Sequence, residues 1–207
     1  MRTLVIDTAT HACSVALFDD ARAVASHYEV IKRGHAERLL PLVANLPERG
    51  RADQIKVNVG PGSFTGIRVG VAAARALGLA WGLPVSGYGC LTLVAAMARA
   101  GQLSPVDIDV IMSGGHGEFF FQSFDETGAA QSDAVSLTPV VLAHRSTSSV
   151  VASDVVSTLE PLLFDRVFVD KLPDAASWHL ISECASLPAS PVYGRAPDAK
   201  LPRGIAA

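Results

Sequence analysis

The sequence is short of cysteine and of charged residues, and each shortage excludes a class of protein. Its 207 residues include three cysteines, which are far apart and form no CxxC pair: Cys13, Cys90 and Cys184. An odd number of isolated cysteines favours reduced thiols in a cytosol over a disulfide framework, and we expect all three to be small buried residues. The formal net charge is -3 and the pI is near 6.0, so the chain lacks the basic excess of a protein that grips nucleic acid by itself.

The sequence also lacks a long hydrophobic run. Its most apolar window, Val69–Val85, is interrupted by Arg75, Gly78, Gly82 and Pro84 and is too short for a membrane span. The first residues lead directly into a strand pattern, so we expect no signal peptide and no membrane contact. Apolar residues make up 49% of the chain, which is enough to bury a core and excludes a disordered protein.

The first half of the chain alternates strand and helix patterns. Three apolar segments in a row predict an antiparallel meander. In the helix that follows, the apolar positions 39, 42, 43 and 46 have helical spacing, with Pro41 inside the pattern. The expected elements are strands over 3–8, 13–18 and 22–30, a helix over 35–46, a strand over 54–59, a helix over 66–81, a strand over 84–86 and a helix over 90–100.

The second half begins after a plausible boundary at 101–105 and has shorter elements. Trp178, Ile181 and Cys184 stand three residues apart and predict a helix over 175–187. The second half looks like a reduced copy of the first, although no sequence repeat is detectable. Its other expected elements are strands over 107–112 and 118–124 around a turn at 113–117, a polar connection over 125–136, a short helix over 139–144, and strands over 150–153 and 166–169.

The most informative segment is the glycine-rich stretch at 60–70, which reads Gly-Pro-Gly-Ser-Phe-Thr-Gly-Ile-Arg-Val-Gly. It follows an apolar strand and opens a helix, where Ser63 or Thr65 can cap the first turn by accepting a backbone hydrogen bond. The free N–H groups and the positive dipole end of such a helix start also form an anion site. No Lys-Ser/Thr pair follows the glycines, and the spacing is not that of the dinucleotide fingerprint. These residues leave a structural turn and a phosphate contact both open.

Three segments of the chain resemble the bacterial TsaB proteins, also called YeaZ. Residues 60–68 are similar to the signature loop of that family, residues 4–17 to its N-terminus, and residues 191–200 to its closing motif. The resemblance spans nearly the whole chain and implies an α/β protein of the actin-like ATPase (ASKHA, ribonuclease-H-like) fold. It implies two subdomains with mixed sheets, one over residues 1–102 and a smaller, degenerate one over residues 103–207.

The resemblance also implies a function in making threonylcarbamoyladenosine in tRNA. A member of this family is a non-catalytic dimerisation subunit that partners and activates the catalytic relative TsaD and helps to recruit the ATPase TsaE. We therefore expect a cytoplasmic protein that meets tRNA only through this complex; pairing with a second copy of itself is the further partner considered. No metal and no cofactor inside the subunit are expected. Ser63, Thr65 and Arg68 are candidates for a contact with ATP or ADP at the subunit boundary.

The helix expected over 66–81 carries a row of small residues at every fourth position. Such a row lies along one helix face and lets another backbone come close. The residues alone leave open whether this face packs on the chain's own sheet or on a partner. The resemblance favours a partner, because the first two helices of such proteins build the contact with TsaD or with a second TsaB copy. The interface residues that it implies are Leu39, Leu42, Val43, Leu46, Gly66, Gly70, Ala74 and Gly78.

Two rival functions belong to the same superfamily, namely a metallopeptidase of the glycoprotease M22 type and a small ATP-dependent kinase. The metallopeptidase requires a cluster of ligands, but Leu39 stands four residues after His35 where a second histidine would complete a pair. His35 is therefore expected at a helix start or on the surface. The kinase requires intact phosphate hairpins, but Ala9 and Thr10 stand where a glycine would let phosphate approach. Asp7 is accordingly expected to brace its hairpin.

Other candidate chemistry is sparse. No GxSxG elbow is present, and His11, His116, His144 and His179 stand alone in the sequence, so nothing marks them as ligands. Residues 113–115 read Ser-Gly-Gly, where TsaB proteins usually show Asp-Ala-Arg. The chain therefore lacks the Asp and Arg charges of that motif, and any contact that these two side chains make with a partner or a nucleotide is in doubt here.

Overall fold

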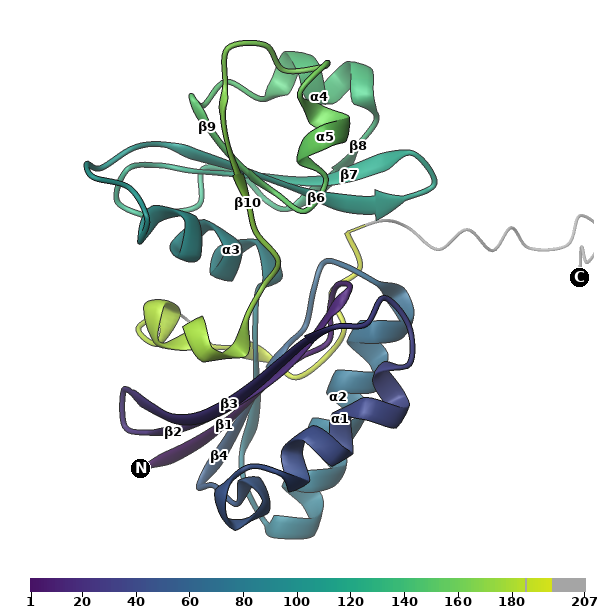
Figure 1. Cartoon of the computed structure of the whole chain (residues 1–207), viewed down its shortest axis with the longest axis vertical. Helices are drawn as coiled ribbons and strands as arrows, with labels where there is room; N and C mark the ends of the chain where they lie inside the picture. The colour runs from purple at the N-terminus through teal and green to yellow at the C-terminus, as the bar shows by residue number, and fades with distance from the viewer. Residues whose placement is uncertain (185, 195–207) are drawn as a thin grey trace, which may run out of the picture.

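The computed structural model of the chain describes residues 1–184 and 186–194. It contains two β-sheets, one above the other in Figure 1, and we call the parts around them the first and the second lobe. The first half of the chain forms β1 (Arg2–Asp7), β2 (Ala12–Asp19), β3 (Arg22–Val30), α1 (His35–Ala44), η1 (Pro47–Gly50), β4 (Gln54–Asn58), α2 (Phe64–Trp81), β5 (Val85–Tyr88) and α3 (Cys90–Arg99). The second half forms β6 (Ile108–Gly115), β7 (Glu118–Phe124), β8 (Val135–Leu137), α4 (Pro139–Arg145), β9 (Val150–Ser153), α5 (Val156–Leu159), β10 (Val167–Asp170), η2 (Ala175–Ile181) and β11 (Leu187–Pro188).

The two sheets repeat one topology. The strand order is β11-β5-β4-β1-β2-β3 in the first sheet and β10-β9-β6-β7-β8 in the second. In each sheet three consecutive strands form an antiparallel meander. The fourth strand pairs in parallel with the first one, and the fifth pairs in parallel with the fourth. The helices α1 and α2, of 10 and 18 residues, correspond in order to α4 and α5, of 7 and 4 residues. The predicted α/β fold with two mixed sheets is confirmed, and the second lobe is the reduced copy.

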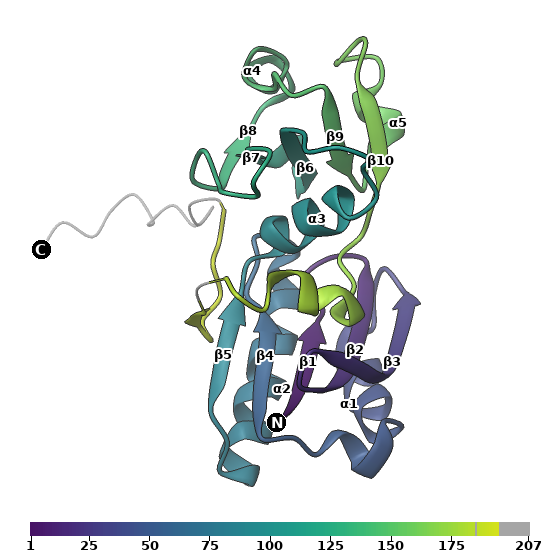
Figure 2. The same ribbon diagram turned by 90° about the vertical axis from the view of Figure 1, so that its left-hand side faces the viewer.

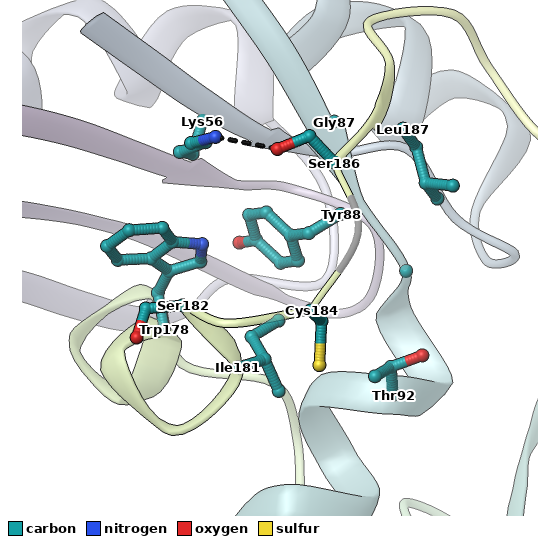
Figure 3. Close-up of a pocket in the computed structure, with 11 residues that line it drawn as sticks. Lys56, Gly87, Tyr88, Thr92, Trp178, Ile181, Ser182, Cys184, Ser186 and Leu187 are labelled. Carbon is teal, nitrogen blue, oxygen red and sulfur yellow. Dashed lines mark hydrogen bonds between the residues drawn. The ribbon is translucent and has the colours of Figure 1, made fainter. Parts of the chain in front are cut away.

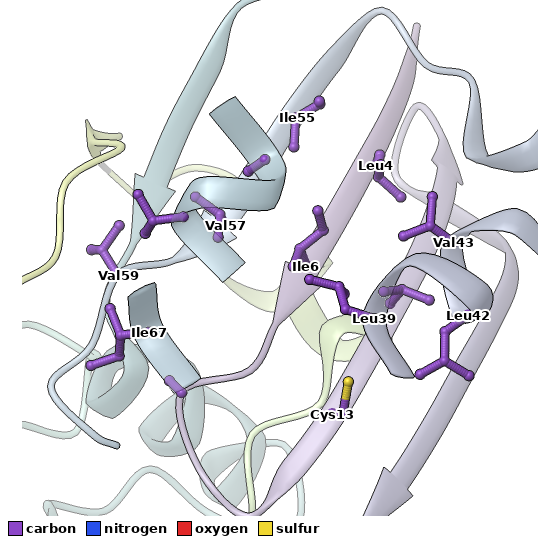
Figure 4. Packing of buried hydrophobic residues seen from close by; sticks show 14 of the residues in the cluster. Leu4, Ile6, Cys13, Leu39, Leu42, Val43, Ile55, Val57, Val59 and Ile67 are labelled. Atoms are coloured by element: carbon purple, nitrogen blue, oxygen red, sulfur yellow. The ribbon is translucent and has the colours of Figure 1, made fainter. Parts of the chain in front are cut away.

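The helices α1 and α2 cover one face of the first sheet (Figure 4). Alternate residues of the strands, such as Leu4 and Ile6 of β1, point toward them and are fully buried. From α1, the apolar residues at helical spacing insert into this core: Leu39, Leu42, Val43 and the following Leu46 are at most 3% exposed. These four residues were expected to contact a partner; their burial inside the chain corrects that expectation.

The small-residue row of α2 faces the same sheet. A Cβ atom added at Gly66 would lie 2.1 Å from the Thr8 carbonyl oxygen, and one at Gly70 would lie 2.4 Å from Thr8 Oγ1. At Gly78 it would lie 2.3 Å from a methyl carbon of Val85, and Ala74 is fully buried. The residues of this row were expected to contact a partner; instead they pack within the chain, because a larger side chain at these positions would push α2 off the first sheet.

The helix α3 lies between the two sheets (Figures 1 and 2). Leu91 and Val94 pack in the core formed with β6, β7 and β9 of the second lobe. Leu93 on the other side packs with Trp178 of η2 and Phe18 of β2. The helix that connects the lobes therefore contributes to the core of both.

The last part of the described chain returns to the first lobe. The helix expected over 175–187 is wrong in type and length, because η2 is a 3-10 helix that ends at Ile181. Trp178 and Ile181 are buried, and their three-residue spacing is that of one 3-10 turn. β11 then pairs antiparallel with β5, Leu187 opposite Gly87. The division into subdomains between residues 102 and 103 stays a prediction. The segment with β11 comes after residue 103 in the sequence but lies on the first sheet.

The cysteines divide into two environments. Cys13 and Cys90 are fully buried, as expected, and burial raises the pKa of the Cys13 thiol to about 11 and that of Cys90 well above its usual value. Both thiols therefore stay protonated and unreactive at neutral pH. Cys184 is exposed, so the expectation that it is buried is wrong.

Candidate functional site in the cleft between the lobes

A cleft of about 710 Å³ lies between the lobes. The first lobe lines it with the β1–β2 turn, with Lys32 after β3 and with the start of α2. The second lobe contributes the β6–β7 turn and Asp154 at the end of β9, and Tyr193 and Gly194 border it from the C-terminal segment. The cleft is large enough for a small-molecule ligand, and its walls come from segments that are far apart in the sequence.

The glycine-rich turn before α2 seats that helix on the β1–β2 turn. Ser63, one of the two predicted caps, is the N-cap of α2. Its Oγ accepts a hydrogen bond of 3.2 Å from the Gly66 N–H. The Ser63 N–H donates to the Ala9 carbonyl at 2.7 Å. A Cβ atom at Gly62 would lie 2.1 Å from that carbonyl oxygen, so glycine is required for this close approach. The structural role expected of the turn is therefore present, and the phosphate contact stays a prediction.

Arg68 is held at the edge of the cleft by two aromatic residues. Its Nε donates a hydrogen bond of 2.8 Å to Tyr193 Oη, and its guanidinium carbon lies 3.6 Å from the centre of the Phe64 ring. The rings of Phe64 and Tyr193 lie 5.1 Å apart, tilted by 32°. Of the three residues predicted to contact a nucleotide, Ser63 and Arg68 line the cleft, whereas Thr65 is exposed and is not among the lining residues.

The β6–β7 turn forms the opposite wall and depends on its glycines. His116 and both neighbours, Gly115 and Gly117, have φ between 53° and 77°, in the left-handed region that glycine adopts readily. Asp154 accepts a hydrogen bond of 2.8 Å from the Ser113 N–H and ties this turn to the end of β9. Burial raises the pKa of the Asp154 carboxyl, and the nearby His11 of the first lobe lowers it in part. Lys32 and Arg68 bring fixed positive charge to the same cleft, which suits an anionic ligand.

Asp7 lies behind the β1–β2 turn and is completely buried. Its carboxylate accepts hydrogen bonds from Asn58 Nδ2 at 2.7 Å, Tyr88 Oη at 3.0 Å and the Ala9 N–H at 3.2 Å. The expectation that Asp7 braces its hairpin is met, because the bond from Ala9 closes the turn after β1. Burial raises the pKa of Asp7 from 3.8 to about 6, against the lowering by these hydrogen bonds.

The buried Asp7 predicts a stability loss between mildly acidic and neutral pH. The folded protein holds the proton of Asp7 more tightly than the unfolded chain does, so the stabilisation by the protonated form is lost as the pH rises from 3.8 to about 6. The difference corresponds to about 3 kcal/mol. Asp7→Asn should remove this decline while keeping an acceptor for Asn58. Urea unfolding of both proteins from pH 4 to pH 7 measures the effect, and parallel stability curves for the two would contradict it.

Comparison with known proteins places the chain in a family. The family model of TsaD, tRNA N6-adenosine threonylcarbamoyltransferase, matches residues 26–146, more than half of the chain. The tRNA threonylcarbamoyladenosine biosynthesis protein TsaB of Escherichia coli is 42% identical over 100 residues, which cover 46% of this chain and 43% of that protein. The TsaB of Bacillus subtilis is 33% identical over 113 residues, which cover 51% and 49%. The chain belongs to this family as one of its TsaB (YeaZ) members.

The match thus spans about half the length of the curated TsaB relatives. A solved structure is similar over nearly the whole of this chain. YeaZ from Pseudomonas aeruginosa superposes with a TM-score of 0.78 at 28% identity and covers 93% of this chain and 99% of its own. The fold is therefore the actin-like ASKHA fold that the sequence resemblance implied. Residues 195–200 of the TsaB-like closing motif lie outside the described residues.

The structure places three histidines of this TsaB member in or near the first core and the cleft. His35 starts α1, as expected, but it is buried and its Nε2 lies 3.2 Å from the Ala12 carbonyl oxygen. His11 and His116 come from different lobes and both line the cleft. Among the described residues no group of three or more His, Cys, Asp or Glu side chains is placed to hold a metal ion. In the same part of the chain, no helix is both long and apolar enough to cross a bilayer.

Sequence reasoning missed several residues of the cleft. Asp154 and Phe120 carry no local motif of their own, and Tyr193 is 125 residues away from its partner Arg68. The closing motif that contains Tyr193 was the one available signal. It marked the segment without indicating what the segment touches, because a hydrogen bond between distant residues leaves no spacing pattern.

Proposed function

We propose that this chain is a non-catalytic subunit in the biosynthesis of threonylcarbamoyladenosine in tRNA and that it pairs with a TsaD-type catalytic subunit. The observation that carries the proposal is the match to curated proteins named for this pathway, at 33–42% identity in the two relatives above. In the proposed complex the chain also helps to recruit a TsaE-type ATPase and meets tRNA in the cytoplasm only through its partner. Its net charge of -3 agrees with the last point.

The state of Asp7 supports a subunit without its own phosphate chemistry. A carboxylate that holds a metal and a phosphate must present a free oxygen to solvent or ligand. In this chain the Asp7 carboxylate is fully buried and already accepts three hydrogen bonds, one of them from Tyr88. Ala9, which follows it in the turn, is also fully buried. The kinase alternative would need this turn to open.

The outer face of α1 and α2 supports the pairing. The sheet side of both helices is buried, so a partner that contacts these helices meets their opposite side. That side carries several exposed apolar or small residues, with Arg75 among them, and we call the following residues the outer helix face: Leu40, Ala44, Ala72, Ala76 and Leu79. Leu40 is 52% exposed and Leu79 is 88% exposed. Large apolar side chains at such exposure on adjacent helices are typical of a surface that another helix covers.

Leu79→Glu should weaken the complex with the TsaD-type subunit at least tenfold, equivalent to about 1.4 kcal/mol, because a charge would be desolvated at the interface. The unfolding free energy should stay unchanged, since Leu79 is exposed in the isolated chain. Isothermal titration calorimetry of the two purified proteins measures the affinity. Val140→Glu is the matched control, because Val140 is 72% exposed on α4 of the second lobe. Equal affinity of Leu79→Glu and parent would refute this face, and failure of the parent to bind would refute the pairing itself.

A further inference from the structure

Lys56 is directed into a small pocket on the face of the first sheet opposite α1 and α2 (Figure 3). Its neighbours Ile55 and Val57 point into the first core, so strand alternation places Lys56 on the other face. There Lys56 Nζ donates a hydrogen bond of 2.9 Å to Ser186 Oγ and lies 5.9 Å from the centre of the Trp178 ring. The lysine is thus oriented by a strand, by η2 and by the segment before β11.

The pocket offers a positive charge that no carboxylate balances. Among the residues that the structure describes, no Asp or Glu oxygen lies within the 4.0 Å of Lys56 Nζ that defines an ion pair. Burial lowers the pKa of Lys56 from its usual 10.5, because the ammonium group has lost part of its water. A partly dehydrated cation without a counter-charge is stabilised by an anion that replaces the lost water.

The walls and the size of the pocket select the kind of anion. The volume is about 100 Å³. Since an apolar cavity of about 150 Å³ accommodates benzene, this pocket takes roughly four non-hydrogen atoms. Trp178, Tyr88 and Ile181 supply apolar walls. Lys56 is the one lysine or arginine among the described lining residues, which fits a single negative charge.

We propose that this pocket binds a short-chain carboxylate such as acetate or propionate. The carboxylate group accepts hydrogen bonds from Lys56 Nζ and Ser186 Oγ, and the alkyl end packs against Trp178 and Ile181. The site lies on the opposite face of the sheet from the outer helix face. It is therefore independent of the pairing proposed above, and either proposal can fail without the other.

Trp178 provides a direct readout of binding. The chain has two tryptophans, so Trp81→Phe leaves Trp178 as the single indole reporter. Titration of this variant with sodium acetate and then sodium propionate should change its emission saturably in the millimolar range. In ¹⁵N spectra the amides of Gly87 and Gly89, which line the pocket, should shift along the same binding curve, and those of Gly101 and Gly128 should not.

The charge of Lys56 is tested in the same background. Lys56→Met should weaken acetate binding at least tenfold, Lys56→Arg should retain most of it, and Lys171→Met outside the pocket should leave it unchanged. Sodium chloride at equal ionic strength is the salt control, and thermal unfolding verifies that each variant is folded. Ser186→Ala, with a loss of several-fold, is the second variant if Lys56→Met does not fold. An equal response to chloride, no saturable response to either carboxylate, or unchanged binding in Lys56→Met and Ser186→Ala would overturn the proposal.

Discussion

Replacing Asp109 by alanine is expected to lower the unfolding free energy by about 3–5 kcal/mol. Asp109 lies in β6 and is completely buried. One carboxylate oxygen accepts hydrogen bonds from Ser123 Oγ at 2.6 Å and Ser148 Oγ at 2.9 Å. The other accepts from Ser146 Oγ at 2.7 Å and from the N–H groups of Thr147 and Ser148 at 2.9 and 3.1 Å. Without the carboxylate, these donors remain buried or part-buried with no acceptor, which is the expensive case for polar groups.

The expected consequence is loss of the second lobe before the first. The loop at 146–148 joins α4 to β9, so Asp109 connects the central strand of the second sheet to the connection that positions its neighbour. Urea unfolding followed by circular dichroism measures the stability. Asp125→Ala is the matched control, because Asp125 accepts a comparable set of bonds from Thr127, Ala129 and Gln131 on a solvent-exposed turn. Water can replace those bonds, so the control should lose far less, and equal losses would show that burial is not the cause.

Gly66→Ala is expected to destabilise the chain by about 1–3 kcal/mol, although alanine is the better helix former by about 1 kcal/mol. The added methyl group would lie 2.1 Å from the Thr8 carbonyl oxygen, a backbone atom that cannot move without displacing the β1–β2 turn. The strain would therefore separate α2 from β1 at the first core. Chemical unfolding of the variant measures it.

Gly101→Ala is the control for Gly66→Ala. Its added Cβ atom would have its nearest contact 3.5 Å away, at the Ala98 carbonyl oxygen, which is an ordinary separation. We expect a change of less than about 0.5 kcal/mol there. If Gly66→Ala were as stable as the parent, the seam between α2 and β1 would tolerate a methyl group and would not explain the glycine row.

The close packing of α2 on the first sheet also changes the result expected of larger side chains in α2. The pattern of α2 suggests that Gly70→Leu or Ala74→Leu weakens a partner contact and leaves the fold intact. Gly70 lies against Thr8 and Val57, and Ala74 is fully buried, so both substitutions should unfold the first lobe instead. Leu79 and Ala76, on the opposite side of the helix, are the positions where a contact can be tested without that damage.

Local patterns were sufficient for much of the fold. The antiparallel meander of β1–β3 follows from alternating apolar segments separated by tight turns, and α2 follows from its cap at Ser63 and the glycine at its end, Gly82. These features depend on residues within a few positions of each other, where backbone conformation and capping act. The short elements β8 and α5 were not predicted, because three or four residues carry too little periodicity.

By itself, the sequence determined the family, the order of the main elements and the presence of a tight turn that seats a helix. The tertiary structure decided which side of each helix is buried and which distant residues meet, such as Arg68 with Tyr193 and Asp7 with Tyr88. A row of small residues is equally suited to a sheet or to a partner, since both need close approach. Only the position of β1 beneath α2 distinguishes them, and that position results from the packing of the whole first lobe.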